Sequence, residues 1–375
     1  MARFHYASTK DADMRYLVGT AVADPFFCVE NGEGAFAFLS VLEIGSFREH
    51  GKKGVTAVPL EPLMEKARAA GAGASPHALA KRILARYGPP GTDLSVSAHL
   101  PLDMADALRA DGARLRVADP FLPERAVKSP EEVAAIRESC ARTALAFLRI
   151  EEILRESAID GAALRWKGEP LTSERLKREA GRVLFDADME NADGIIISSG
   201  AHAAMPHHAG TGAIAAGTSI VCDIFPRSAV TGYFADLTRT YVKGKPSETL
   251  ARMYAAVAAA QDAGFAAIRA GVEGKDAHQA AAAVIRDSGF GAGEATPDSV
   301  PGFIHGLGHG LGLEVHEPPR MGAHASGTLT AGNVVTVEPG LYHPEHGGVR
   351  IEDVVLVTED GCEKLSEHPR ELVIA

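Results

Sequence analysis

Three histidines and two carboxylates lie close together in the C-terminal part of this 375-residue chain. His305, His309 and His316 fall within twelve residues of a glycine-rich segment, and Glu338 and Glu352 follow in the strand-like runs VTVEPG and VRIEDVVLV. Histidine nitrogens and carboxylate oxygens are the ligands that suit Mn, Co, Zn or Fe. Glycine lets the backbone approach a metal or a substrate closely. The segment therefore indicates a metal site.

Two aspartates upstream enlarge this set. Asp223 lies in SIVCDIF and Asp236 lies in GYFADLTRTYV, and both runs are apolar and strand-like. A charge buried in such a strand is costly unless it is paired or bound to a metal. Four such carboxylates and one glycine-flanked histidine are better explained as one ligand set than as five unrelated structural residues.

Two alternatives to a metal site would each explain only part of this pattern. A lone histidine is more often a hydrogen-bonded structural residue than a ligand. The glycines Gly308, Gly310 and Gly312 suggest a nucleotide-binding loop, but no GxGxxG or GxxxxGK[ST] motif follows, and His309 would have no role in such a loop. A metal centre explains more of the residues than either alternative.

The run Asp223, Asp236, His309, Glu338 and Glu352 resembles the five-ligand signature of the pita-bread metallopeptidases, a family that includes methionine aminopeptidase, aminopeptidase P and prolidase. The phrases ADLTRT, GHGLGLEVHE, VEPGLY and GGVRIEDVVLVTEDG carry this resemblance, which is close over about the last two-thirds of the chain. It implies an α/β (α+β) protein with a C-terminal pita-bread domain of the creatinase/aminopeptidase type and a smaller N-terminal α/β domain.

The resemblance also implies a role for each ligand. Two divalent metals would be bound, with Asp223 on one, His309 on the other, and Asp236 and Glu352 bridging them. Glu338 would bind the second metal and carry a proton from water to the leaving nitrogen. Metals bound in this way activate a water molecule and polarise the scissile carbonyl. The oxygen-rich ligand set favours Mn²⁺, with Co or Zn as alternatives.

Other histidines match family positions that contact the substrate. By this resemblance, His305 and His316, on either side of His309, steady the tetrahedral intermediate. His207 directly follows a proline in AHAAMPHHAGTG. It is a better match than His208 to a Pro-His pair that reaches the substrate in the family. A structural role is the alternative for His305 and His316.

Three further residues are candidates for substrate binding. Arg320 stands in HEPPR, where similar prolidases have an arginine near the C-terminal carboxylate of the substrate. A guanidinium matches a carboxylate in a bidentate way, and the alternative is a solvated loop arginine. Tyr342 is expected either to line the pocket or to pack in the core. Arg350 is expected to orient the bridging carboxylate of Glu352.

The activity that the resemblance implies is hydrolysis of Xaa-Pro bonds in small proline-containing peptides. Arg320 and the modest chain length favour a dipeptidase (prolidase) over aminopeptidase P, which shares every ligand. Methionine aminopeptidase is less favoured because its members commonly lack such an N-terminal domain. Creatinase-like members and non-enzymatic binding members of the fold usually lose ligands, whereas this chain keeps all five. A homodimer is expected by resemblance.

The composition argues against several other classes of protein. The chain has 38 basic and 49 acidic residues and a net charge of −11, which disfavours nucleic acid or an anionic membrane as a partner. Its four cysteines are far apart and form no CxxC pair, which fits a reducing, cytoplasmic setting. The N-terminal segment lacks the apolar core of a signal peptide. No apolar run reaches membrane-spanning length.

Two domains are expected to position these residues, an N-terminal α/β domain over 1–125 and a catalytic domain over 126–375. The first resembles in outline the N-terminal domain of prolidases and aminopeptidases P, and it carries no chemical motif. Within it, the apolar segments 23–31 and 34–47 are predicted to form paired strands.

The catalytic domain is expected to begin with a long helix. Ser129 is predicted as its N-cap, with a proline at the first helical position and a capping box, and the helix is expected to reach about Ser157. The segment around Trp166, the single tryptophan, is predicted to be a packed loop without a function. Further helices are predicted over 172–185, 248–270 and 275–288.

Overall fold

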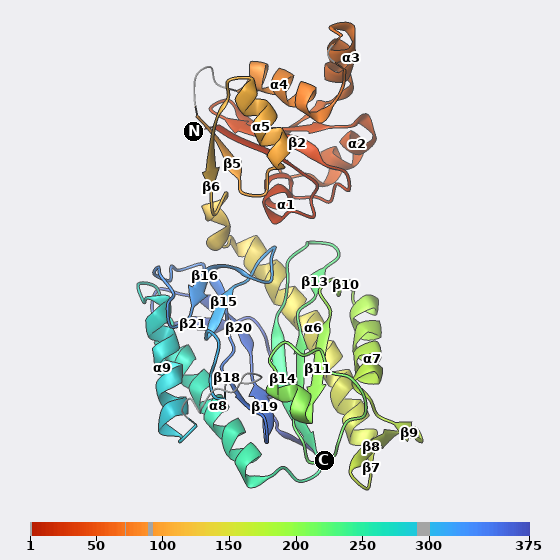
Figure 1. The fold of residues 1–375 in the computed structure, drawn as a ribbon, viewed down its shortest axis with the longest axis vertical. Coiled ribbons are helices and arrows are strands. Elements are labelled where there is room, and N and C mark those ends of the chain that lie inside the picture. The colour runs from red at the N-terminus through yellow and green to blue at the C-terminus, as the bar shows by residue number, and fades with distance from the viewer. Residues whose placement is uncertain (1, 72, 89–92, 291–300) are drawn as a thin grey trace. The chain divides into compact units, whose positions relative to one another are not determined.

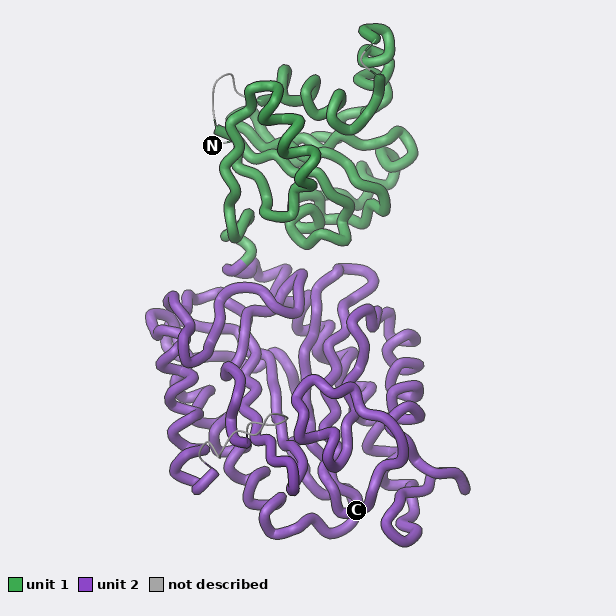
Figure 2. Tube along the Cα trace, viewed as in Figure 1, with its two compact units in different colours: residues 1–125 green, residues 126–375 purple. Residues whose placement is uncertain are grey.

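The chain divides into two compact units, Met1–Arg125 (unit 1) and Ala126–Ala375 (unit 2) (Figure 2). Separate clusters of buried apolar side chains form the cores of the two units. Within the described part of the chain, helices that combine the length and the apolar character needed to cross a membrane are absent. The computed structural model describes residues 2–71, 73–88, 93–290 and 301–375.

Unit 1 is built on a mixed sheet with the strand order β4-β3-β2-β1-β5-β6 among the described residues (Figure 1). The strands are β1 (Ala2–Ala7), β2 (Phe26–Asn31), β3 (Gly34–Leu39), β4 (Val55–Pro59), β5 (Asp93–Ser97) and β6 (Arg114–Ala118). The helices are α1 (Ala12–Val18), α2 (Val41–His50), α3 (Glu61–Ala69), α4 (Pro76–Tyr87) and α5 (Leu102–Ala110).

Helices cover both faces of this sheet because β2 is apolar on both sides. Phe27 and Val29 pack with residues of α3, α4 and α5. Phe26 and Cys28 point to the opposite face and pack with residues of α1 and α2. Alternate residues of a strand point to opposite faces, so a strand that is apolar throughout needs a helix layer on each side.

One prediction in unit 1 is wrong in part. The strands β2 and β3 pair antiparallel as predicted, but the strand expected over 34–47 ends at Leu39 and α2 begins at Val41. Ser40 is the N-cap, and its side chain accepts a hydrogen bond from the N–H of Leu42 at 3.3 Å. Apolar residues at this spacing suit a short strand or a helix equally, and the cap decides between them.

The described residues of unit 2 include two helix pairs. The helices are α6 (Pro130–Glu156), α7 (Ser173–Asp186), α8 (Glu248–Ala267) and α9 (Gly274–Asp287). In Figure 1, α7 lies at the right of the unit and α8 and α9 lie at the left, with strands between them. The capping box predicted at Ser129 is present, and the predicted helices agree with the observed ones to within about three residues.

Over the parts of unit 2 that the structure describes, the strands form two larger sheets and several short pairings. One sheet has the order β11-β12-β14-β22 and the other β16-β15-β17-β20-β21. The first consists of β11 (Ile195–Ser199), β12 (Ile220–Ile224), β14 (Leu237–Lys243) and β22 (Val373–Ile374). The second consists of β15 (Gly308–Gly310), β16 (Glu317–Met321), β17 (Val334–Val337), β20 (Asp353–Val357) and β21 (Cys362–Lys364).

Short elements complete the unit. The strands β18 and β19 form a hairpin that packs on α8, its strand β19 contacts β12 and β14 of the first sheet, and η2 packs on β19. The remaining bounds are β7 (Ala158–Asp160), β8 (Ala163–Trp166), β9 (Glu169–Pro170), β10 (Met189–Glu190), β13 (Arg227–Ser228), β18 (Gly340–His343), β19 (Gly347–Arg350), and the 3₁₀ turns η1 (Pro123–Ala126, which crosses the unit boundary) and η2 (Gly200–Ala204).

Each large sheet packs on its own helix pair. Buried side chains of α6 and α7 form one core with β11, β12 and β14. Those of α8 and α9 form another core with β17, β20 and the hairpin β18–β19. An antiparallel bridge between Thr238 of β14 and Glu352, next to β20, joins the two sheets. Residues near this bridge are therefore brought together from both halves of the unit.

The segment around Trp166 differs from the prediction. It is not a loop, because Trp166 ends β8, which pairs with β7 and β9 in a small sheet. The indole ring is buried, and its Nε1–H donates to Glu156 Oε2 at 2.7 Å. A buried indole N–H usually finds such a partner, so packing accounts for the tryptophan.

Candidate metal centre

The five predicted ligands line one cavity in unit 2, which has a volume of about 1040 Å³. Asp223 lies in β12 and His309 in β15. The other three stand at strand ends: Asp236 directly precedes β14, Glu338 directly follows β17, and Glu352 directly precedes β20. Strand ends leave side chains free to turn into a cavity while the sheets hold the backbone.

Three of these side chains already form a compact group of donors. The donor atoms of Asp236, His309 and Glu352 all lie within 4.8 Å of one another, and all three residues are buried. His309 Nε2 is also 3.1 Å from Glu338 Oε1 and 3.8 Å from Asp236 Oδ2. Imidazole nitrogen and carboxylate oxygen thus converge on one small volume.

The backbone near His309 favours the tautomer that a metal ligand needs. Nδ1 of His309 lies 3.2 Å from the carbonyl oxygen of Gly310. A carbonyl oxygen can only accept, so Nδ1 carries a hydrogen, and Nε2, which faces the carboxylates, is the nitrogen left for a metal. Metal-binding histidines commonly show this arrangement, in which one ring N–H donates to a carbonyl.

Two threonines support the carboxylates, and the sequence analysis missed both. The hydroxyl of Thr238 donates to Glu352 Oε2 at 2.7 Å, and that of Thr336 donates to Glu338 Oε1 at 3.3 Å. Thr238 lies in ADLTRT and Thr336 in VVTVEPG, each two residues from a predicted ligand. Residues at this spacing share a strand face, which is the signal that was available.

Arg350 has a different partner from the one expected. Its Nη2 donates to Asp223 Oδ2 at 2.6 Å, and its Nη1 donates to the hydroxyl of Tyr342 at 2.8 Å. Arg350 therefore orients Asp223, and the expected contact with Glu352 is wrong in this respect. Side chains alternate along a strand, and the strand ends between Arg350 and Glu352, so their two-residue separation did not predict a shared direction.

Two carboxylate oxygens in the cavity have no partner. Asp223 Oδ1 and Asp236 Oδ1 are buried and make no hydrogen bond among the described residues. A buried carboxylate oxygen in this condition is costly, and a divalent cation would remove the cost. The residues present thus fit a metal centre on their own geometry.

The pKa shifts of the cavity carboxylates also favour a metal centre. Burial raises the pKa of Asp236 and of Glu352 well above the usual carboxylate range, and the charges of Asp223 and Glu338 raise both further. Burial acts in the same direction on Glu338, but the hydrogen bond and charge of His309 outweigh it and lower the pKa of Glu338. Cations placed among these groups would relieve the repulsion.

This gives a prediction about pH. Asp236 and Glu352 have folded-state pKa values above their unfolded values, so their protonation stabilises the metal-free protein, and this contribution is lost as pH rises through the raised values. Metal binding must displace those protons. The gain in Tm when Mn²⁺ is added to chelator-treated protein should therefore grow from about pH 5 to about pH 8. A gain that shrinks over this range would contradict the site.

The three predicted substrate histidines also line the cavity. His305 lies between two groups: its Nδ1 is 2.8 Å from the carbonyl oxygen of Gly306 and its Nε2 is 2.9 Å from the hydroxyl of Tyr342. Burial lowers the pKa of His305 and lowers that of His316 to about 4. Both imidazoles are therefore neutral near pH 7. The ring of His316 stands edge-on to that of His309, with 4.3 Å between ring centroids.

The structure separates the two adjacent histidines of the 200s loop. His207 lines the cavity. His208 instead stacks on His202 with 3.9 Å between ring centroids, and its Nδ1 accepts from the N–H of Gly210 at 2.9 Å. This placement favours His207 over His208 as a residue that meets a ligand, as the sequence analysis expected.

The substrate-binding candidates differ in position. Arg320 is exposed at the cavity, where it belongs to β16 and pairs with His309 of β15, so it is not in a loop. Arg350 lines the cavity as well. Tyr342 is buried and is not among the lining residues; its hydroxyl joins Arg350 to His305. Tyr342 is therefore better described as a core residue than as one that contacts a substrate directly.

Two further residues, Asp193 and His324, also line the cavity, and nothing in their sequence context indicated it.

Comparison with known proteins gives consistent matches. The sequence profile of metallopeptidase family M24 matches residues 134–359. The Xaa-Pro dipeptidase of Pyrococcus furiosus is 34% identical over 255 residues, which are 66% of this chain and 65% of that enzyme, just under two thirds of its length. The probable dipeptidase PepE of Mycobacterium tuberculosis is 32% identical over 284 residues, 76% of this chain and 69% of that protein.

Solved structures resemble the whole chain. The prolidase from Pyrococcus furiosus is 25% identical with a TM-score of 0.78, covering 98% of this chain and 97% of that one. The dipeptidase PepE from Mycobacterium ulcerans is 28% identical with a TM-score of 0.73, covering 100% and 93%.

Proposed function

The chain belongs to metallopeptidase family M24, and we propose that it hydrolyses Xaa-Pro dipeptides with two divalent metal ions, as a prolidase. The observation that carries this proposal is the cavity of unit 2, which gathers Asp223, Asp236, His309, Glu338 and Glu352 and leaves two buried carboxylate oxygens without partners. The names of the relatives support the substrate class, since one is an Xaa-Pro dipeptidase and one a prolidase.

Each ligand has a proposed place. Asp223 would hold one ion and His309 and Glu338 the other, with Asp236 and Glu352 shared. When bound, such a metal pair supplies an activated water and polarises the scissile carbonyl. Glu338, beside His309 and on the cavity wall, would serve as the group that takes up and releases a proton during hydrolysis.

The other cavity residues would position the peptide. His305, His316 and His207 line the same cavity as the ligands. A neutral imidazole with a free N–H suits a developing oxyanion, because it adds no fixed charge to the ground state. Both ring nitrogens of His305 are engaged in the structure, with the carbonyl oxygen of Gly306 and the hydroxyl of Tyr342, so His305 would turn its N–H to the peptide on binding. The relay from Arg350 through Tyr342 holds the ring beside the cavity until then.

Three finer features belong to the same proposal. Mn²⁺ is the proposed ion, because the four carboxylates and one imidazole make an oxygen-rich set that suits hard cations. Co²⁺ or Zn²⁺ would fit the same donors. A homodimer and a cytoplasmic location are proposed from the family resemblance and from the scattered cysteines, which are free in the structure.

Arg320 would select for substrate length. A dipeptide places a carboxylate next to the scissile bond, and a carboxylate that enters a partly desolvated cavity needs a cation. Arg320 is exposed at the cavity wall, opposite His309 in the paired strands. Xaa-Pro dipeptides are therefore expected to be cleaved faster than Xaa-Pro-Yaa tripeptides by the Mn²⁺-loaded protein. Equal or faster cleavage of the tripeptides would assign the chain to the aminopeptidase P type instead.

The variant Arg320→Ala tests whether this arginine binds the dipeptide carboxylate. Losing one charged hydrogen bond costs about 1.5–3 kcal/mol of binding free energy, so the KM for dipeptides should rise roughly 10- to 150-fold. Arg320→Lys keeps the charge but loses the bidentate fork, so its KM should be intermediate. An unchanged dipeptide KM in Arg320→Ala would show that this arginine is only solvated.

The aminopeptidase alternative has one observation in its favour. A volume of about 1040 Å³ is at the upper end of ordinary ligand pockets and exceeds what a dipeptide needs. A third residue would find room there. The tripeptide comparison therefore decides between the two substrate classes.

A further inference from the structure

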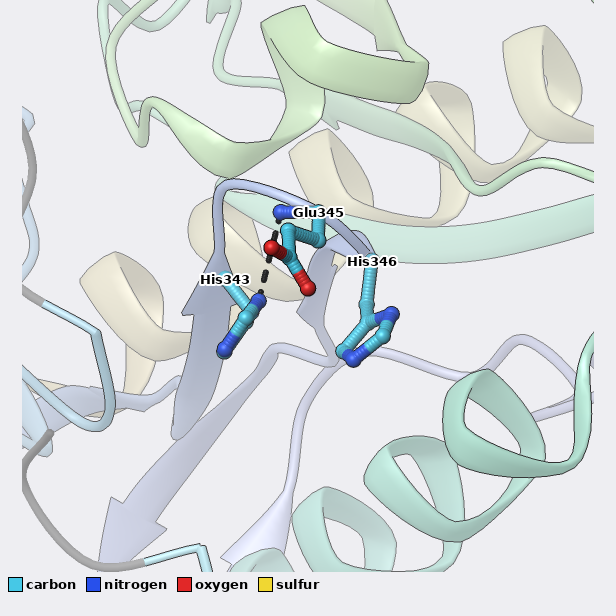
Figure 3. A group of neighbouring side chains, drawn as sticks. All are labelled: His343, Glu345 and His346. Carbon is cyan, nitrogen blue, oxygen red and sulfur yellow. Dashed lines mark hydrogen bonds between the residues drawn. The ribbon is translucent and has the colours of Figure 1, made fainter.

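A second group of metal-binding side chains lies at the turn of the β18–β19 hairpin. His343 ends β18, and Glu345 and His346 follow before β19 begins at Gly347. One donor atom from each of His343, Glu345 and His346 lies within 4.8 Å of the other two. Figure 3 shows the carboxylate of Glu345 close to both imidazoles at the turn. We call these three residues the hairpin triad.

The hairpin triad is separate from the cavity described above. None of its three residues is among the residues that line that cavity. The hairpin register pairs His343 with Gly347 at the turn and Gly340 with Arg350 at the other end. Three residue steps along a strand span roughly 10 Å, so an ion at the turn would share no ligand with the centre.

The turn already holds the three side chains near one another. The imidazoles of His343 and His346 stack with 4.5 Å between centroids and 24° between planes, and both rings are half-buried. The N–H of Glu345 donates to His343 Nδ1 at 3.2 Å, and the Glu345 side chain is exposed. Gly347 has φ +85 and packs against Ser219 so closely that a Cβ would lie 2.5 Å from its hydroxyl.

We propose that the hairpin triad is an additional metal site, which takes a Zn²⁺-like ion through two imidazoles and one carboxylate. Two His and one Glu are a known zinc ligand set, and the exposed side of the turn leaves a position for water. Imidazole nitrogen favours Zn²⁺ or Ni²⁺ over Mn²⁺, whereas the oxygen-rich centre favours Mn²⁺. The two sites therefore differ in preference.

Binding requires a small local adjustment. Tetrahedral ligand atoms at zinc lie roughly 3.4 Å apart, and the donor atoms of the hairpin triad lie within 4.8 Å of one another, so side-chain rotation must close each separation by at most about 1.4 Å. The ring of His343 must also release the N–H of Glu345. If Nδ1 binds the metal, its lone pair is no longer free to accept, and if Nε2 binds the metal, Nδ1 carries the ring hydrogen. The bound ion would cross-link the two sides of the turn between β18, which carries Tyr342, and β19, which carries Arg350.

Zinc uptake by the full-length protein tests this proposal. Chelator-treated protein is dialysed against Zn²⁺, and bound metal is measured at neutral pH. The double variant His343→Ala, His346→Ala should bind about one equivalent less than wild type. The control His50→Ala, an exposed histidine beside Glu49 in unit 1, should bind as much as wild type. Equal zinc content in wild type and the double variant would overturn the proposal.

A second measurement needs no substitution in the turn. Diethyl pyrocarbonate modifies accessible imidazoles, and mass spectrometry of the peptide that holds His343 and His346 reports their protection. Zn²⁺ should protect both rings in wild type and also in Asp236→Asn, whose central site is impaired. Glu345→Ala should raise the zinc concentration needed for protection by at least about 10-fold. Protection of neither ring at any zinc concentration would refute the site.

Discussion

Asp236→Asn is expected to lower kcat/KM for Xaa-Pro dipeptides by at least about 10³-fold. An amide bridges two cations poorly, and the stabilisation that a metal pair gives the transition state is several kcal/mol, where each 1.36 kcal/mol is tenfold in rate. The donor atoms of Asp236 lie within 4.8 Å of those of His309 and Glu352, so the substitution reaches the middle of the group. Metal analysis should show a loss of bound Mn²⁺ alongside the loss of activity.

A matched control is available in the same cavity. Asp193 is exposed on the cavity lining and lies outside the ligand group. Asp193→Asn should therefore leave the metal content unchanged. If Asp236→Asn kept wild-type turnover and metal content, the dinuclear site would be wrong.

His305→Ala is expected to lower kcat/KM by about 10²- to 10³-fold, the usual cost of removing one donor to the transition state. The ring of His305 lines the cavity but is not part of the ligand group. The metal content of the variant should therefore stay near wild type. A loss of metal would make His305 a ligand and would reverse its assigned role.

Tyr342→Phe separates positioning from contact. It removes the hydroxyl that joins Arg350 to His305 but keeps the imidazole on the cavity wall. Its loss in kcat/KM should be smaller than that of His305→Ala. If the two variants lost activity equally, the hydroxyl rather than the imidazole would be the group that matters.

Much of the fold was predictable from sequence because the signals are local or shared with a family. The capping box at Ser129 predicted the start of α6. The phrases around His309 and Glu352 identified the family, and the profile match over residues 134–359 and the likeness to prolidase structures confirm the α/β fold with a pita-bread domain. The strand expected over 34–47 was half wrong, because Ser40 divides the apolar run and caps the N-terminus of α2.

The partners of the site residues were less predictable. Arg350 and Asp223 are 127 residues apart in the chain, and only the hairpin and β12 together bring them into contact. The relay through Tyr342 likewise needs the three-dimensional arrangement of β18 and the glycine-rich segment. Sequence spacing reports which face of a strand a residue occupies, but it does not report which distant strand stands opposite.

The most direct test of the metal centre is a crystal structure of the Mn²⁺-loaded protein with anomalous scattering measured for manganese. We expect two anomalous peaks in the cavity of unit 2, enclosed by Asp223, Asp236, His309, Glu338 and Glu352. A single peak, peaks bound by other side chains, or no peak within this group would contradict it.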